Sequence, residues 1–162
     1  EAIRHLNTKP SRIYHSTLSR AADTARLVNE ALRVDMTEMD HLREHVFGDW
    51  ENAHWPDVKI LMEQGMEPPN GETYLAFTMR NKAVLHDIMA TDHVTPTLLV
   101  AHGGVFHAIG RLYGQKVGEV GNCVLHYFEP TLTGKSFPWA ITRFKPCSQH
   151  GLQQDIFTPP HS

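Results

Sequence analysis

The sequence predicts an α/β fold in three layers, with a mostly parallel central sheet flanked by helices and followed by an antiparallel hairpin. Strand-like and helix-like segments alternate along most of the chain, which is typical of a parallel sheet with crossover helices. The run Thr97 to Ala101 is apolar without a break, as expected of a strand buried on both faces. Two strand-like runs near the C-terminus, with a turn-rich segment between them, predict the hairpin.

The first half of the chain predicts a helix, a strand, a second helix and a second strand. The second helix has apolar residues at nearly helical spacing, and Ser16 to Ser19 provide hydroxyl groups that favour a helix start. In chain order the segments are an opening helix that ends before Lys9-Pro10, a strand over Arg12–His15, a helix over Ser19–Leu32 with apolar Ala21, Ala25, Leu27, Val28 and Leu32, and a strand over Val34–Met39.

The second half predicts a charged loop, further helices, the buried strand and the hairpin. Glu67 to Gly71 is the strongest helix breaker in the sequence and separates two helices. The longer of these is expected to turn four apolar residues inward, Leu75, Met79, Leu85 and Ile88. In chain order the segments are a loop or broken helix over Asp40–Asn52, helices over Trp55–Gln64 and Glu72–Ala90, the strand over Thr97–Ala101, a helix over Val105–Tyr113, and strands over Cys123–Phe128 and Trp139–Phe144 joined by Thr131–Lys135.

The composition of the 162 residues is that of one globular domain, with 41% hydrophobic and 20% charged residues. We expect a domain over residues 1–146 and a polar C-terminal tail over residues 147–162. A formal charge of −3 provides no basic surface for a nucleic acid. No apolar stretch approaches the roughly 20 residues of a membrane helix. Cys123 and Cys147 are too few for a disulfide framework, which is typical of a cytoplasmic protein.

His102-Gly103-Gly104 follows the buried strand and opens a helix. This arrangement brings together an imidazole, unobstructed backbone N–H groups and the positive end of a helix dipole, a combination that suits a phosphate. A tight strand-to-helix turn with an incidental histidine explains the same residues equally well.

Arg20 stands in the first turn of the Ser19–Leu32 helix, where the helix dipole disfavours a cation. An anionic ligand would offset that cost, because a guanidinium group binds phosphate through two hydrogen bonds. The alternative is an ordinary solvated surface arginine.

Leu42 to Glu51 brings carboxylates, a histidine and aromatic residues around Gly48. A carboxyl group beside aromatic rings can have a raised pKa and then act as a general acid. The alternative is an acidic, solvated loop.

Together these three motifs resemble those of the histidine phosphatase superfamily, in its phosphoglycerate-mutase-like branch. The motifs are His102-Gly103-Gly104, the run Ser-x-Leu-Ser-Arg-Ala-x-x-Thr-Ala from Ser16 to Ala25, and Leu-Arg-Glu-x-x-Phe-Gly-x-Trp-Glu from Leu42 to Glu51. Pro69-Asn70-Gly71-Glu72 looks like the Gly-Glu segment before the family's substrate-facing helix. The resemblance runs from residue 1 to about residue 144.

The resemblance implies a role for each matching residue. His102 and Arg20 would clamp the transferred phosphoryl group, while Glu44 would protonate the leaving oxygen and then activate water. The substrate side of the site would be formed by Gly103, Ser16, Glu72 and Arg80, with Trp50 and Trp55 as further candidates. The implied mechanism uses no metal and no cofactor, and the implied partner is a phosphorylated small molecule.

The nucleophile that the resemblance implies is the histidine of an Arg-His-Gly motif at the end of a first strand. The sequence contains no Arg-His-Gly, and Arg4-His5-Leu6 is no substitute because no apolar strand precedes it. We therefore expect a chain that lacks its first strand, within a βα unit of roughly 30 residues or more. Such a sheet would have a groove beside Thr97–Ala101 that exposes unpaired backbone groups.

The implied function is hydrolysis of a phosphomonoester through a phosphohistidine intermediate. A phosphatase is favoured over a phosphoglycerate mutase because the stretch between Glu44 and Glu72 is short, whereas the family's mutases carry longer insertions there. The alternative is a catalytically inactive member that binds a phosphorylated ligand or a partner protein, and a homodimer is also left open. Sugar phosphates, nucleotide-derived phosphates and a cobalamin-precursor phosphate all remain as substrates.

A rival motif overlaps the same loop. His41-Leu42-Arg43-Glu44-His45 matches the H-x-x-E-H pattern of a class of zinc proteases. That chemistry needs both histidines on one turn of a continuous helix and a third ligand downstream. Gly48 follows closely, which disfavours such a helix.

Overall fold

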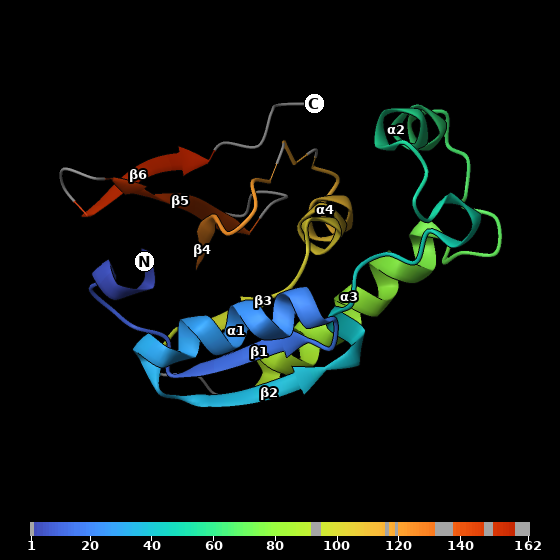
Figure 1. The fold of residues 1–162 in the computed structure, drawn as a ribbon. Coiled ribbons are helices and arrows are strands. Elements are labelled where there is room, and N and C mark those ends of the chain that lie inside the picture. The colour runs from blue at the N-terminus through green and yellow to red at the C-terminus, as the bar shows by residue number, and fades with distance from the viewer. Residues whose placement is uncertain are drawn as a thin grey trace.

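The strands of the protein form two separate three-stranded sheets in the part of the chain that the computed structural model describes. The described residues are 2–91, 95–115, 117–118, 120–131, 138–147 and 151–157. The first sheet contains β1 (Arg12–Ser16), β2 (Asp35–Met39) and β3 (Thr97–Val100) in the order β2-β1-β3. All its pairings are parallel (Figure 1).

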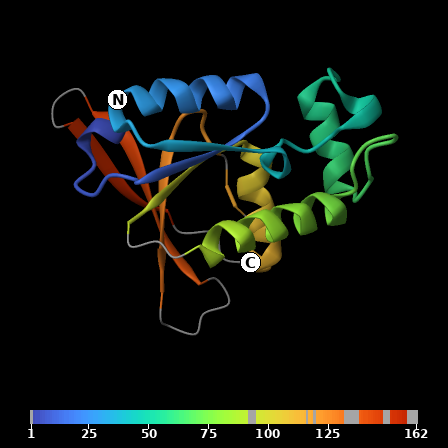
Figure 2. The same ribbon diagram turned by 90° about the horizontal axis from the view of Figure 1, so that it is seen from below.

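The parallel sheet lies between two helices, α1 (Ser19–Leu32) and α3 (Tyr74–Ala90), as Figure 2 shows. Successive side chains of a strand point to opposite faces of the sheet, so the two faces form different apolar clusters. Ile13 packs with Ala21 and Ala25 of α1, whereas Tyr14 packs with Val84 and Ile88 of α3. The predicted three-layer α/β arrangement is therefore confirmed.

The remaining helical elements lie around the carboxyl end of the sheet and at the N-terminus of the chain. They are η1 (Ala2–His5), η2 (Asp40–Leu42), η3 (Gly48–Trp50), α2 (Trp55–Glu63) and α4 (Gly103–Leu112). α4 packs against α3 through Phe77, Val105 and Ala108, and α2 lies beyond the N-terminal end of α3 (Figure 1). None of the helices in the described ranges is both long and apolar enough to cross a membrane.

The second sheet is antiparallel and consists of β4 (Leu125–Pro130), β5 (Trp139–Cys147) and β6 (Gly151–Phe157), in that order. The β4–β5 pair confirms the predicted hairpin. Its predicted turn, Thr131–Lys135, lies outside the described residues except for Thr131. β6 falls within the segment predicted as a loosely held tail, so a polar segment supplies a strand there, while the domain boundary itself stays a prediction.

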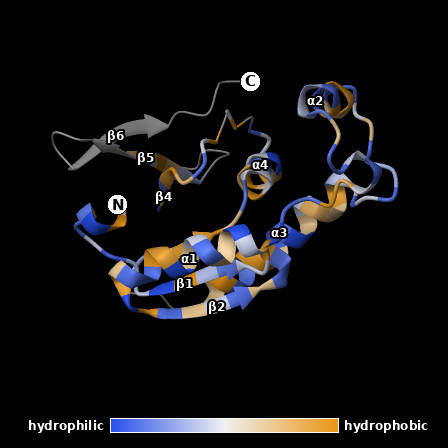
Figure 3. Cartoon of the chain, viewed as in Figure 1, coloured by the Kyte–Doolittle hydropathy of each residue, from blue (hydrophilic) through white to orange (hydrophobic). Residues whose placement is uncertain are grey.

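The predicted order of strands and helices is confirmed. At several helical positions, however, the apolar spacing predicted a buried side chain where the structure has an exposed one. Figure 3 shows hydrophobic and hydrophilic residues mixed along α1, as expected of a helix with one buried face. Leu27, Leu75 and Met79 were expected to face the core, yet they are 67%, 71% and 50% exposed. α3 instead buries a stripe with helical spacing that includes two polar side chains, Phe77, Thr78, Asn81, Val84 and Ile88. The opening helix is a single short turn, η1.

The predictions about β3 need a second correction. β3 stands at the end of the strand order, and Thr97, Leu98 and Leu99 are only partly buried, so it is not covered on both faces along its length. Within the described sheet, β3 has a partner strand on one edge alone. β1 pairs directly with β3, from Arg12 opposite Thr97 to His15 opposite Val100. The opposite edge of β3 pairs with no strand in the described ranges, so the groove beside it and a preceding strand both stay predictions.

Ile13 should be one of the residues that the fold tolerates least when it is shortened. It lies on the central strand, is 0% exposed and packs against Ala21, Ala25 and Val100. Ile13→Ala should lower the free energy of unfolding in urea by about 2–5 kcal/mol, because it removes buried methyl groups and leaves a cavity. Leu27→Ala, on the exposed side of α1, should change it by less than about 0.5 kcal/mol. Equal losses for the two variants would contradict this core.

Candidate active site

The carboxyl ends of two parallel strands bring the first two site residues together. Ser16 is the last residue of β1, and His102 follows β3 and precedes α4. Since neighbouring parallel strands end at the same edge of a sheet, these side chains meet although they are distant in sequence. His102 Nε2 lies 2.8 Å from Ser16 Oγ. Ser16 is fully buried, so the imidazole rests against a fixed partner.

α4 begins directly after His102, and its first backbone N–H groups face the same edge. His102 is the N-cap residue in an extended conformation, with φ −128° and ψ 164°. A β-carbon added to Gly103 would meet no atom within 4 Å, so there is open space beside the first turn of α4. A helix N-terminus with open space beside its first residue attracts anions.

Glu44 occupies the other side of this helix start. It belongs to the Glu44 loop, defined as residues 43–47, which has no helix or strand of its own. Its Oε2 accepts a hydrogen bond from the Gly104 N–H at 3.4 Å, and its Oε1 accepts one from the His45 N–H at 3.0 Å. A β-carbon on residue 104 would overlap Glu44 Oε1 and stand 3.1 Å from Phe77 Cζ, so this approach requires glycine.

Arg20 comes to the site from the first turn of α1. The N-cap residue of α1 is Leu18, without a side-chain cap, and its N–H donates to Ser16 Oγ at 3.2 Å. No hydroxyl group therefore caps the first turn of α1 as predicted. Instead, Ser16 Oγ accepts a hydrogen bond from the backbone N–H of the N-cap residue. The guanidinium group of Arg20 is exposed and pairs with no acceptor in the described ranges. Its charge acts on the His102 imidazole, so the two groups share one electrostatic environment.

The electrostatics of His102 favour a neutral ring in the free site. Burial lowers the pKa of His102, the positive charge of Arg20 lowers it further, and the Glu44 carboxylate opposes both effects. The net result is a pKa below the usual value of 6.5. An anion that enters between Arg20 and His102 would reverse this balance, because it favours the protonated imidazolium.

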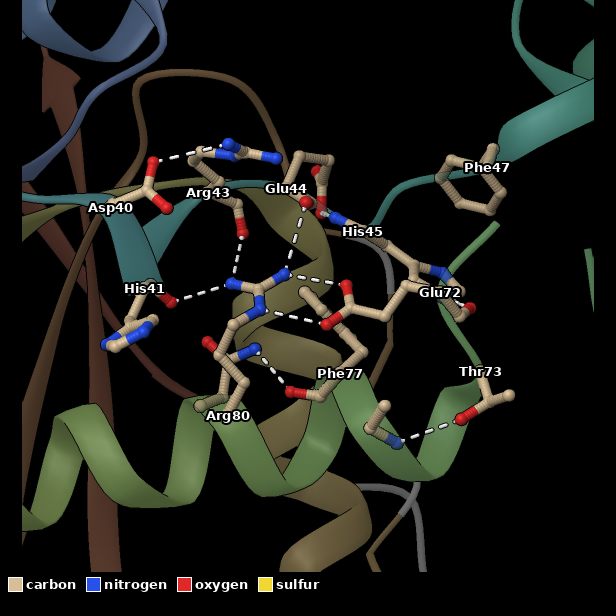
Figure 4. A network of polar contacts seen from close by, with 12 residues as sticks. Asp40, His41, Arg43, Glu44, His45, Phe47, Glu72, Thr73, Phe77 and Arg80 are labelled. Atoms are coloured by element: carbon tan, nitrogen blue, oxygen red, sulfur yellow. Dashed lines mark hydrogen bonds and ion pairs between the residues drawn. The ribbon is translucent and has the colours of Figure 1, made fainter. Parts of the chain in front are cut away.

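Glu72 and Arg80 do not join this cluster directly, although the sequence places them on the substrate side. They pair with each other, and Arg80 also donates to backbone carbonyl groups at the Glu44 loop (Figure 4). Trp55 is 56% exposed and contacts Phe47, with 5.8 Å between the ring centroids. Among the predicted site residues, the structure therefore brings Ser16, His102, Gly103, Glu44 and Arg20 to one edge of the sheet and puts Glu72 and Arg80 behind Glu44.

His45 is a structural residue that the sequence analysis weighed only as a zinc ligand. Its ring is 5% exposed and stacks on Phe77 at 4.8 Å between centroids. Its Nε2–H donates to the Glu72 carbonyl oxygen at 2.6 Å, so this nitrogen is already engaged. In the sequence, His45 stands between an acidic residue and the aromatic Phe47. That position near an aromatic residue could have predicted that its ring packs against other rings.

The helical geometry that the zinc-protease pattern needs is not formed. η2 ends at Leu42, Arg43 is extended, and residues 43–47 form no helix, so His41 and His45 do not share one helical turn. His41 is exposed whereas His45 is buried. Within the described ranges, no three His, Cys, Asp or Glu side chains are grouped so that they could hold a metal ion.

A comparison with protein families decides where this site belongs. Residues 1–127 match the sequence profile of the histidine phosphatase superfamily, branch 1. The chain belongs to the histidine phosphatase superfamily. The motifs on which the resemblance rested, at Ser16, Glu44 and His102, all lie within the matched range.

Characterised relatives are similar to part of this histidine phosphatase chain. The adenosylcobalamin/alpha-ribazole phosphatase of Salmonella typhimurium is 35% identical over 104 residues, which are 58% of this chain and 52% of that protein. The enzyme of the same name from Escherichia coli is 34% identical over 113 residues, 61% of this chain and 54% of its own. A putative phosphoserine phosphatase 2 of Hydrogenobacter thermophilus is 32% identical over 64% of this chain and 56% of its own. The chain thus spans about half the length of the curated relatives it matches.

Solved structures share the fold. A mycobacterial glucosyl-3-phosphoglycerate phosphatase matches with a TM-score of 0.61 and 21% identity, over 91% of this chain and 76% of that one. A putative alpha-ribazole-5'-P phosphatase of Escherichia coli matches with a TM-score of 0.59 and 21% identity, over 97% and 78% of the two chains. At this level of identity the likeness concerns the fold alone.

Inorganic phosphate should raise the pKa of His102 in the full-length protein. The bound anion would counter both burial and Arg20, so we expect a rise of about 1–3, and proton uptake on binding below neutral pH. NMR titration of the His102 ring protons, with and without phosphate, measures this directly. The ring-proton chemical shifts of His86, which is exposed on α3, are the control and should not change when phosphate is added at constant pH. An unchanged His102 titration in saturating phosphate would contradict an anion site here.

Proposed function

We propose that the full-length protein hydrolyses phosphomonoesters through a phosphohistidine intermediate, with Arg20, His102 and Glu44 as its catalytic residues. The observation that carries the proposal is the convergence at one edge of the sheet of an imidazole, the N-terminus of α4 and a carboxylate. His102 Nε2 is 2.8 Å from Ser16 Oγ, and Glu44 Oε2 is 3.4 Å from the Gly104 nitrogen. This set of groups suits phosphoryl transfer.

The anion-binding part of the site would be Arg20, His102 and the N–H of Gly103. The guanidinium group of Arg20 offers two parallel donors to phosphate oxygens. The open space beside Gly103 leaves room for the phosphoryl group at the positive end of α4. Ser16 would hold the His102 ring in orientation through the hydrogen bond described above. All these groups stabilise the negative charge that the equatorial oxygens carry in the transition state.

Glu44 would move the protons. In the first step, the phosphorus–oxygen bond to the leaving group breaks, the phosphoryl group passes to the nucleophilic histidine, and protonated Glu44 gives its proton to the leaving oxygen. In the second step, ionised Glu44 takes a proton from water, which attacks the phosphohistidine and releases inorganic phosphate. The family resemblance assigns the nucleophile to an Arg-His-Gly motif, which these residues do not include.

The substrate would be a small phosphorylated metabolite. The curated relatives named above are adenosylcobalamin/alpha-ribazole phosphatases and a putative phosphoserine phosphatase, which supports an alkyl phosphomonoester. The short stretch between Glu44 and Glu72 favours a phosphatase over a mutase. A cytoplasmic location, a domain over residues 1–146, the absence of a nucleic-acid partner and a homodimer belong to the same proposal.

A second function is supported by one observation. Arg20, His102 and the N–H of Gly103 could bind a phosphorylated ligand without hydrolysing it, as an inactive member of the family would. Binding of phosphate without hydrolysis by the full-length protein would favour this alternative.

Two substitutions should remove the function of Glu44 in different ways. Glu44→Gln cannot transfer a proton, and Gly104→Ala places a methyl group where Glu44 Oε1 lies, so the flexible carboxylate must swing away. We expect each to lower kcat on phosphoserine by about 10²-fold or more, the usual contribution of a general acid. Gly118→Ala, where an added β-carbon meets nothing within 4 Å, is the matched control.

The outcomes separate the parts of this proposal. A full-length protein that binds inorganic phosphate but hydrolyses no phosphomonoester contradicts the hydrolase and favours the inactive member. An active protein in which Gly104→Ala and Glu44→Gln both keep the parent kcat contradicts the acid role of Glu44.

A further inference from the structure

The guanidinium group of Arg80 binds three backbone carbonyl oxygens just before and within the Glu44 loop. Arg80 Nη1 donates to the carbonyl oxygens of His41 at 2.7 Å and Arg43 at 3.1 Å. Arg80 Nη2 donates to the carbonyl oxygen of Glu44 itself at 3.4 Å. Figure 4 shows the side chain reaching these groups from α3.

The remaining N–H groups of Arg80 are taken by one carboxylate. Nε donates to Glu72 Oε1 at 2.9 Å, and Nη2 donates to Glu72 Oε2 at 2.7 Å. A guanidinium group has five N–H donors, and these contacts use all of them. Both side chains are largely buried, at 18% and 16% exposure, and Arg80 also lies 5.0 Å over the Phe77 ring. No donor is left over for a substrate phosphate.

Glu72 holds the other half of the same loop. Its backbone N–H donates to the Val46 carbonyl oxygen at 2.8 Å, and its own carbonyl oxygen accepts from His45 Nε2 at 2.6 Å. The Glu44 loop is thus fixed on both sides of Glu44, by Arg80 before it and by Glu72 after it. The loop has no helix or strand of its own, so these contacts supply its order.

The pair stays charged in this environment. Burial acts to raise the pKa of Glu72, but the hydrogen bonds and the charge of Arg80 outweigh it, and the pKa is lowered overall. An ionised Glu72 keeps Arg80 oriented toward the carbonyl groups. A buried pair with unused donors would be costly, whereas here the carbonyl oxygens satisfy them.

We propose that Arg80, oriented by Glu72, is a positioning residue that holds the Glu44 loop so that the Glu44 carboxylate stays at the Gly104 N–H. This inference rests on the proposed acid role of Glu44. It replaces the substrate contact that the sequence predicted for Arg80 and Glu72. Because the pair acts through Glu44, its loss should reproduce the loss of a general acid and leave phosphate binding intact.

Leaving-group dependence is the readout that a general packing defect would not produce. An alkoxide such as that of serine must be protonated as it leaves, whereas p-nitrophenolate is a weak base and leaves with little help. Loss of the acid therefore lowers kcat/KM, which reports transfer to the histidine, far more for phosphoserine than for p-nitrophenyl phosphate. A misfolded fraction lowers kcat/KM equally for both substrates, and a lost phosphate contact lowers it for both and also weakens inhibition by phosphate.

The test compares Arg80→Met, Glu44→Gln and the double variant in the full-length protein, with Lys82→Met on the exposed side of α3 as control. Arg80→Met should lower kcat/KM, which reports phosphoryl transfer to the histidine, by about 10²-fold for phosphoserine but by less than about 5-fold for p-nitrophenyl phosphate. Inhibition by inorganic phosphate should stay within about 3-fold. The double variant should be no slower than Glu44→Gln alone, because the two residues act as one unit.

Each other outcome overturns the inference. Equal losses of kcat/KM for both substrates together with weaker inhibition by phosphate assign Arg80 to the substrate, and equal losses with unchanged inhibition assign it to folding alone. If Arg80→Met does not fold, as judged by circular dichroism, Glu72→Gln carries the same comparison, since it keeps the shape and removes the charge. A parent enzyme that hydrolyses neither substrate contradicts the proposed function, whereas a selective effect in Glu44→Gln without one in Arg80→Met contradicts only this inference.

Discussion

The parallel pairing of β1 with β3 is the constraint on which the rest of the site depends. The register from Arg12–Thr97 to His15–Val100 makes both strands end at the same level. Two helices start from those ends, α1 shortly after Ser16 and α4 directly after His102. Both N-termini therefore begin at this edge, where the Arg20 guanidinium group acts electrostatically on the His102 imidazole. An anion at this edge would meet donors from both helices.

Glu44 reaches this edge by a different route, because it lies on neither helix. Its loop is ordered by α3, whose Arg80–Glu72 pair binds the backbone on both sides of the acid. The site thus combines a rigid half, built on strand ends, with a half that depends on one buried ion pair. A buried ion pair adds little to stability on its own, so its value here lies in fixing one geometry. Gly104 completes the arrangement by leaving room for the carboxylate.

The rigid half of the site was predictable from sequence, since Ser16, Arg20 and His102 stand where apolar runs end and helices begin. Such local patterns give the ends of elements but not the partner of a strand, so the direct β1–β3 pairing was missed. The pattern also failed on α3, where apolar residues occur on several sides and Met79 looked as suitable for the core as Phe77. The role of Arg80 was missed because its acceptors are backbone carbonyl groups, which every residue carries.

The most direct test of the account is a crystal structure of the full-length protein with tungstate, an oxyanion of phosphate-like shape. The oxyanion should bind at the N-terminus of α4, within about 3 Å of the Arg20 guanidinium group, the His102 ring and the Gly103 nitrogen. The Glu44 carboxylate should face it, with the Arg80–Glu72 pair unchanged behind. Tungstate bound elsewhere, with Arg20 and His102 sharing no oxyanion, would contradict the central claim.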